Sequence, residues 1–125
     1  MKKILIIEAN RELRENTAEL LELEKYKVIT ASNAKSGIEL SLQYRPDLII
    51  SDLTSAELGG QDTVKALSSF VHTKKVPIIF LTSKSGNADR YIGKDLSSDA
   101  YLIKPYDVEE LLKTVADKLA GASYH

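Results

Sequence analysis

The sequence contains no cysteine, only three prolines and no long hydrophobic run. The lack of cysteine excludes disulfides and thiolate metal sites, and it fits a reducing cytoplasm, where we expect the protein to reside. The apolar run at the N-terminus stops at Glu8 and is too short for a signal peptide. Nothing approaches the length of a transmembrane helix, so a membrane is not an expected partner.

The sequence also has no excess of either sign of charge, because 17 basic residues nearly balance 18 acidic ones and the net charge is −1. From that balance we expect no basic surface for direct binding of nucleic acid through its phosphates. The 125 residues are 43% hydrophobic and 28% charged, which is the composition of an ordinary globular protein. Length and composition together predict a single domain over residues 1–125 with its own core.

Short apolar or β-branched runs predict five strands. These are Lys3–Ile7, Lys27–Ala31, Leu48–Ser51, Ile78–Leu81 and Tyr101–Ile103. Three of the runs, ILII, LIIS and IIFL, are apolar almost throughout rather than alternating, which is typical of strands buried on both faces.

Hydrophobic residues at helical spacing follow each predicted strand. From the first helix to the last, the expected sheet-facing residues are Leu13, Thr17, Leu20, Leu21 and Glu24, then Ala34, Ile38 and Leu42, then Val64, Leu67 and Val71, then Ala88, Ile92 and Leu96, and finally Val108, Leu111, Leu112, Val115 and Leu119. A strand followed by a helix five times over predicts an α/β fold, a three-layer α/β/α sandwich around a five-stranded parallel sheet.

In such sheets the functional site lies at the carboxyl ends of the strands. Glu8 follows the first predicted strand and Asp52 the third, while Thr82 follows the fourth and Lys104 the fifth. These residue types suit phosphoryl transfer. An aspartate can form an aspartyl phosphate, a hydroxyl can bond a phosphoryl oxygen, and a lysine can neutralise its charge.

Each of the four residues also has an ordinary structural interpretation. Asp52 suits a helix cap or turn, Thr82 suits the end of a strand, and Lys104 suits a solvated surface. Glu8 could share a Mg²⁺ ion with Asp52, because this ion takes carboxylate and water oxygens, or it could form an ion pair with Lys104. The residues alone leave both possibilities for Glu8 open.

Four stretches of the chain follow one family pattern: KKILIIEAN, RPDLIISDLTSAELGG, VPIIFLTS and DAYLIKPYDVEELL. Through them the whole chain resembles the receiver domain of bacterial two-component response regulators. The resemblance implies a flavodoxin-like (βα)5 topology with strand order 2-1-3-4-5. It also implies a phosphorelay, in which a histidine kinase or a phosphotransfer protein donates a phosphoryl group.

By motif position the resemblance makes Asp52 the phosphoacceptor and Lys104 the residue that contacts the phosphoryl group. It makes Thr82 the switch hydroxyl and Tyr101 the switch aromatic. A downstream protein would bind the face formed by the fourth helix, the fifth strand and the fifth helix. By family analogy, residues expected on that face are Tyr91, Lys94, Leu102 and Tyr106.

The metal ligands implied by the resemblance are Glu8, Asp52 and the backbone carbonyl of Thr54. Family members usually have a second acid after the first strand, and here that position is Ala9. Asn10 has an amide oxygen, but we expect it to cap the first helix instead. The Mg²⁺ site is therefore predicted to be present and weakened. Other departures from the pattern are Ala56, Gly59-Gly60 and Ser97-Ser98.

Two functional hypotheses follow. The first is a receiver that is phosphorylated on Asp52 and changes a protein-interaction face. The second is a pseudo-receiver that binds a partner without phosphorylation, because the metal site is degraded at Ala9.

An enzyme is not expected from this sequence. A flavin binder would need a hydroxyl- or glycine-rich phosphate loop after the first strand, and EANRELREN is neither. A phosphatase with an aspartate nucleophile would need a second aspartate where Thr54 stands. A Ser-His-Asp set is not expected either, because the two histidines are His72, near the third helix, and the terminal His125.

Overall fold

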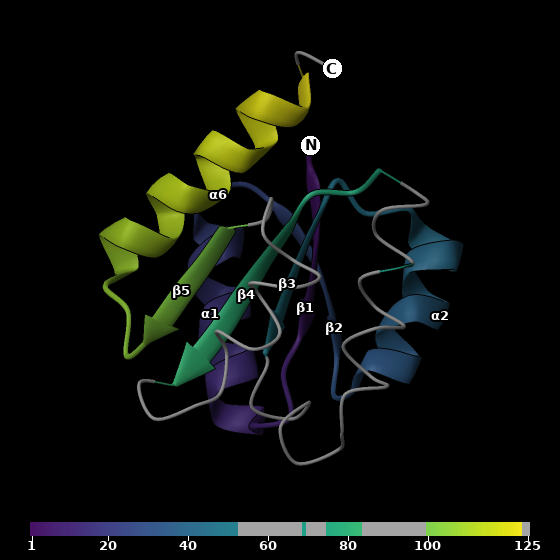
Figure 1. Cartoon of the computed structure of the whole chain (residues 1–125), viewed down its shortest axis with the longest axis horizontal. Helices are drawn as coiled ribbons and strands as arrows, with labels where there is room; N and C mark the ends of the chain where they lie inside the picture. The colour runs from purple at the N-terminus through teal and green to yellow at the C-terminus, as the bar shows by residue number, and fades with distance from the viewer. Residues whose placement is uncertain (53–68, 70–74, 84–99, 124–125) are drawn as a thin grey trace.

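The computed structural model describes residues 1–52, 69, 75–83 and 100–123 of the chain. Its centre is a sheet of five parallel strands in the order β2-β1-β3-β4-β5 (Figure 1). The strands are β1 (Lys3–Ile7), β2 (Lys27–Ala31), β3 (Leu48–Asp52), β4 (Ile78–Ser83) and β5 (Ala100–Lys104). The parallel sheet and its strand order are therefore confirmed.

Three strands run further than the sequence pattern predicted. Asp52 is the last residue of β3 and pairs with Leu81 of β4. Lys104 is the last residue of β5 and pairs with Ser83, the last residue of β4. The pattern missed these ends because a polar residue interrupts the apolar run, whereas the backbone ladder does not depend on side-chain polarity. The polar residues at this edge are thus held by the sheet itself.

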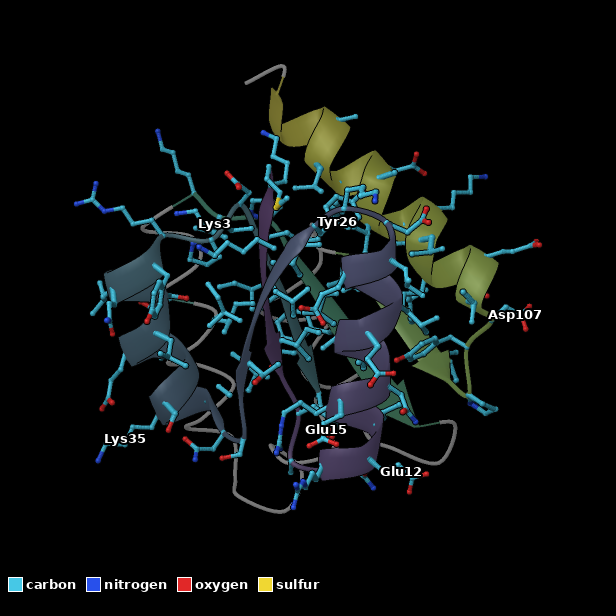
Figure 2. All side chains as sticks on the ribbon, turned by 180° about the vertical axis from the view of Figure 1, so that it is seen from behind. Lys3, Glu12, Glu15, Tyr26, Lys35 and Asp107 are labelled. Carbon is cyan, nitrogen blue, oxygen red and sulfur yellow. The ribbon has the colours of Figure 1, made fainter. Side chains whose placement is uncertain are left out.

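Helices cover both faces of the sheet. The helices α1 (Arg11–Leu23) and α6 (Val108–Ser123) pack on one face, and α2 (Ala34–Tyr44) packs on the other, as Figure 1 shows from the front and Figure 2 from behind. For these elements the predicted three layers are confirmed. The helices predicted around residues 64–71 and 88–96 lie outside the described residues. Among the helices that are described, none combines the length and the apolar character of a membrane span.

The core consists of two clusters, one on each face of the sheet. The cluster on the α2 side contains Leu5, Ile7, Ala31, Ile49, Ile78 and Phe80. The cluster on the α1 and α6 side contains Ile4, Ile6, Leu21, Leu48, Ile50, Ile79, Leu81, Leu102, Leu111, Val115 and Leu119. Along β1, β3 and β4, successive residues belong to the two clusters in turn, so both faces of each strand are buried. This is why these strands are apolar throughout. Each large side chain buried in this way stabilises the fold by about 1.5–3 kcal/mol.

The predicted faces of α1 and α6 are largely correct. Thr17 and Leu21 of α1 are buried, as are Leu111, Val115 and Leu119 of α6. Two assignments were wrong. Glu24 is exposed because α1 ends at Leu23 and Glu24 is its C-cap residue. Val108, the first residue of α6, is 45% exposed.

The predicted face of α2 is correct at Ile38, which packs against the core, and wrong at Leu42. Leu42, which was expected to face the sheet, is 56% exposed, whereas Gly37 and Ser41 are buried. A Cβ atom placed on Gly37 would overlap Cδ1 of Ile7 and come within 2.7 Å of its Cγ1. The helix therefore touches β1 at its glycine, and this close approach decides which residues of α2 face the sheet.

We expect Gly37→Ala to lower the free energy of unfolding by about 1 kcal/mol in chemical denaturation. Overpacking a core costs about 1–3 kcal/mol, and the better helix propensity of alanine offsets about 1 kcal/mol of that. Ile7→Val removes the overlapping Cδ1 and is the matched second change. The double variant should be less destabilised than the sum of the two single variants, and strict additivity would contradict the proposed overlap.

Candidate functional site

Two buried carboxylates lie at the carboxyl edge of the sheet. Ile7 of β1 pairs with Ser51 of β3, so Glu8 and Asp52 are the next two residues opposite each other. We call each such set of paired residues across the strands one level of the register. Glu8 is 2% exposed and Asp52 is 6% exposed. Adjacent strands are about 4.8 Å apart, so two ionised carboxylates here repel each other unless a cation or a proton compensates. The edge therefore favours a positively charged ligand or side chain.

Glu8 is held at several points. Its backbone N–H donates to the carbonyl of Ala31 at 3.0 Å, which extends the β1–β2 ladder by one residue. Its Oε2 accepts the backbone N–H of Asn10 at 3.0 Å. Its backbone carbonyl accepts a hydrogen bond from Nη1 of Arg14 at 2.8 Å. The carboxylate consequently has a defined position rather than moving freely in solvent.

The next two residues add no side-chain ligand to this position. Ala9 is exposed and has no side-chain oxygen. Asn10 is the N-cap of α1, and its Oδ1 accepts the backbone N–H of Leu13 at 2.9 Å. The prediction that Asn10 caps the first helix is confirmed. Its amide oxygen is therefore committed to the helix, and it does not replace the missing acid.

The backbones of the other predicted site residues reach the same edge from β4 and β5. Asp52 pairs with Leu81, so Thr82 stands one level beyond Asp52 in the register. Because Ser83 pairs with Lys104, Lys104 stands two levels beyond Asp52. The edge thus brings together the backbones of residues from four neighbouring strands, β1, β3, β4 and β5, and their roles stay predictions. The proposed ion pair between Glu8 and Lys104 stays a prediction.

The predicted set has two further residues, Tyr101 and Thr54. Tyr101 of β5 pairs with Phe80, one level before Leu81 and Asp52. Thr54 lies outside the described residues, so the role of its carbonyl stays a prediction.

The donor atoms at this edge match Mg²⁺ in type but are few. Carboxylate oxygens from Glu8 and Asp52 are the hard ligands that this ion prefers, and waters commonly complete its shell. Within the described part of the chain, no three acidic, histidine or cysteine side chains gather into a metal-binding group. The residues present therefore fit a Mg²⁺ ion that would be held mainly by two carboxylates and water, and the weakness of the site stays a prediction.

Sequence reasoning missed the role of Arg14. Its half-buried side chain reaches back from the first turns of α1 to the carbonyl of Glu8. The only signal was an arginine close behind the capping residue Asn10, and a surface arginine there would look the same in sequence. Its contact fixes the backbone that carries the Glu8 carboxylate.

Sequence reasoning also misplaced Tyr106 and Leu102. Leu102 is 4% exposed and belongs to the core, so it does not lie on an interaction face. Tyr106 is half-buried against the same cluster, and its hydroxyl lies 3.1 Å from Oγ1 of Thr17. Family analogy failed here because it ignored which side of the strand and loop each residue occupies. Tyr91 and Lys94 lie outside the described residues.

The acidic residues of α1 do not belong to the site. The four acids of α1 and the acid at its C-cap are all exposed: Glu12, Glu15, Glu19, Glu22 and Glu24. Figure 2 shows Glu12 and Glu15 pointing outward near the start of α1. Glu15 accepts a hydrogen bond from Arg11 at 2.9 Å, and an exposed pair of this kind contributes little to stability.

Comparisons with known proteins agree with this architecture. A family model described as the response regulator receiver domain matches residues 4–116. Protein PilH of Pseudomonas aeruginosa is 32% identical over 121 residues, covering 97% of this chain and 100% of PilH. The transcriptional regulatory protein CpxR of Escherichia coli K12 is 36% identical over 115 residues, covering 92% of this chain but only 48% of CpxR. The chain thus spans about half the length of CpxR.

Solved structures give the same result. The chemotaxis protein CheY4 of Vibrio cholerae superposes with a TM-score of 0.76 at 27% identity, covering 94% of this chain and 98% of that one. A receiver-modulated diguanylate cyclase structure from Pelobacter carbinolicus has a TM-score of 0.80 at 29% identity, with 99% and 97% covered. A receiver domain protein from Clostridium thermocellum, at 24% identity, has a TM-score of 0.83, covers 99% of this chain and 98% of that one, and supports the fold alone.

We expect Ala9→Asp to strengthen Mg²⁺ binding at least about tenfold, because it adds a carboxylate beside Glu8 and Asp52. Binding is measured by calorimetric titration of the unphosphorylated protein. Asn10→Asp is the control, since it adds the same charge one residue along while aspartate still caps α1. Equal gains from both variants would show that the gain comes from charge alone and not from a ligand at position 9.

Proposed function

The chain belongs to the response regulator receiver domain family, and we propose that it acts in a phosphorelay by accepting a phosphoryl group on Asp52. The observation that carries this proposal is the register of the carboxyl edge. It sets buried Asp52 level with buried Glu8 and places the backbones of Thr82 and Lys104 one and two levels further on the next strands.

In the proposed reaction, an oxygen of the Asp52 carboxylate forms a bond to phosphorus. The bond from phosphorus to the donor's histidine nitrogen breaks at the same time, and the nitrogen keeps the electron pair. The chain supplies position and charge rather than covalent help, as is usual for phosphoryl transfer. When bound, Mg²⁺ supplies positive charge to the transferred oxygens. Lys104 supplies a second positive charge, and Thr82 a hydroxyl that bonds a phosphoryl oxygen.

Glu8 orients the cation in this proposal. Its carboxylate is fixed by the Asn10 N–H, and its backbone is fixed by Arg14, so little rearrangement is needed when the cation arrives. With Ala9 in place of a second acid, the site carries less negative charge than the family pattern. Less charge weakens cation binding, but it also reduces the repulsion that the incoming phosphoryl oxygens meet.

The proposed donor is a histidine kinase or a phosphotransfer protein. The proposed output is a protein partner that binds the face built from the fourth helix, β5 and the last helix, labelled α6. Two apolar residues are exposed on the described part of that face: Ile103 is 44% exposed and Val108 is 45% exposed. Movement of Thr82 and Tyr101 after phosphorylation would change this face as a two-state switch. A signalling role without catalysis of its own, in the cytoplasm, completes the proposal.

One observation favours a second function. Ala9 removes a carboxylate at the metal position, which is the change expected in a pseudo-receiver that binds its partner without phosphorylation. The two functions differ in one respect that can be measured, namely whether the Asp52 carboxylate matters for partner binding.

We expect wild type, incubated with a small-molecule phosphodonor and Mg²⁺, to gain the mass of one phosphoryl group. Asp52→Ala should gain none, and Ala9→Asp should gain it at a lower Mg²⁺ concentration than wild type. Intact-mass spectrometry over a Mg²⁺ series gives the result directly. Asn10→Asp again serves as the charge-matched control.

Two outcomes would contradict the proposal. A mass gain that persists in Asp52→Ala would place the phosphoryl group elsewhere. A gain in Ala9→Asp with none in wild type would favour the pseudo-receiver, and partner binding that is unchanged in Asp52→Ala would then be expected.

A further inference from the structure

One hydrogen bond joins two parts of the chain that are far apart in sequence. The hydroxyl of Tyr106, in the connection between β5 and α6, lies 3.1 Å from Oγ1 of Thr17 in the middle of α1. The two residues are 89 positions apart. Thr17 is 3% exposed, and the Tyr106 side chain packs against the core cluster on the α1 and α6 side.

The burial of Thr17 makes this contact hard to lose. A hydroxyl removed from water needs a partner, and leaving it without one costs more than an ordinary exposed hydrogen bond contributes. Tyr106 supplies that partner while its ring fills apolar space beside α1. The position of the ring and the position of the hydroxyl are thus fixed together.

The hydrogen bond between Tyr106 and Thr17 lies close in sequence to a residue of the proposed phosphoryl site. Lys104 ends β5, Pro105 follows, and Tyr106 comes next. Proline restricts its own φ and the backbone of the residue before it, so the three residues form a stiff connection. The backbone of Lys104 is therefore held on one side by its pairing with Ser83 and on the other by Tyr106.

Helix α1, whose Thr17 hydrogen-bonds Tyr106, also holds Glu8, one of the two acids of the site. The N-cap of α1 donates its backbone N–H to the Glu8 carboxylate, and Arg14 of α1 donates to the Glu8 carbonyl. Thr17 lies one turn further along the same helix. Helix α1 consequently contacts both the residue proposed to hold the cation and the segment that leaves the end of β5, residues 104–107, which we call the Lys104 turn.

We propose that Tyr106 is a positioning residue for phosphoryl transfer, which fixes the Lys104 turn against α1 through the hydroxyl of Thr17. This inference rests on the proposed phosphorylation of Asp52. Tyr106 does not touch the phosphoryl group and acts through the backbone it holds. Its hydroxyl, rather than its ring alone, supplies the fixed distance between α1 and the turn.

The first measurement needs no phosphorylation. We compare amide hydrogen exchange in wild type, Tyr106→Phe, Thr17→Val and Thr17→Ser. Removing either hydroxyl should raise exchange at the amides of Lys104, Tyr106 and Asp107 about fivefold, the equilibrium effect of one hydrogen bond. Thr17→Ser keeps the hydroxyl and should exchange as wild type does.

Tyr26→Phe is the matched control for the tyrosine change. Tyr26 is also half-buried against the same core cluster, but it lies just beyond the far end of α1, away from Glu12 (Figure 2). Its variant loses the same oxygen atom and should leave exchange at the Lys104 turn unchanged. This control separates the effect of losing the Tyr106–Thr17 hydrogen bond from a general effect on the core.

The second measurement is the rate of Asp52 phosphorylation by a small-molecule donor, at a temperature where every variant is folded. Tyr106→Phe and Thr17→Val should each slow the reaction between about threefold and tenfold, as expected for a misplaced charged group. The double variant should be no slower than either single variant, because both remove the same contact. Thr17→Ser and Tyr26→Phe should react at the wild-type rate.

Unchanged exchange at the Lys104 turn in Tyr106→Phe would overturn the inference, whatever the phosphorylation rates. Raised exchange with an unchanged phosphorylation rate would also overturn it, because the hydroxyl would then only stabilise the loop. A wild type that is never phosphorylated would instead refute the proposed function. The exchange comparison would then decide alone whether Tyr106 holds the turn.

Discussion

The parallel pairing of β1 with β3 is the constraint on which the site depends. It sets Ile7 opposite Ser51 and therefore Glu8 level with Asp52. The same two strands contribute to both core clusters, so neither can shift by one residue without moving apolar side chains out of the core. The energy that holds the two carboxylates side by side therefore comes from the hydrophobic core, not from the carboxylates.

Two buried acids at neighbouring strand ends are unfavourable by themselves, and the surroundings of Glu8 show how the chain manages this. The backbone N–H of Asn10 donates to the Glu8 carboxylate, and Arg14 donates to the Glu8 backbone carbonyl, so hydrogen bonds that involve a charged partner hold both the carboxylate and its backbone. With Ala9 in place of a second acid, the edge contains less charge to compensate. For the proposed function, this lower charge predicts a weaker cation site and a less repulsive phosphoryl site.

Helix α1 connects the site to the rest of the fold. Its cap contacts the Glu8 carboxylate, its first turns contact the Glu8 backbone, and its middle contacts the loop after β5. On the other face, α2 touches β1 at Gly37, directly against Ile7. The strand that leads into Glu8 is thus packed closely from both sides, which limits its movement and keeps the carboxylate in register.

The sequence by itself determined the parallel five-stranded sheet, the edge where the polar residues gather, the family and the capping role of Asn10. Local patterns suffice for these, because apolar runs, helical spacing and cap residues act over a few positions. Tertiary structure alone decided that the α2 face is centred on Gly37, that Arg14 binds the Glu8 carbonyl and that Tyr106 bonds Thr17. Each of these depends on the distance between elements, and packing across the sheet sets that distance after the local elements have formed.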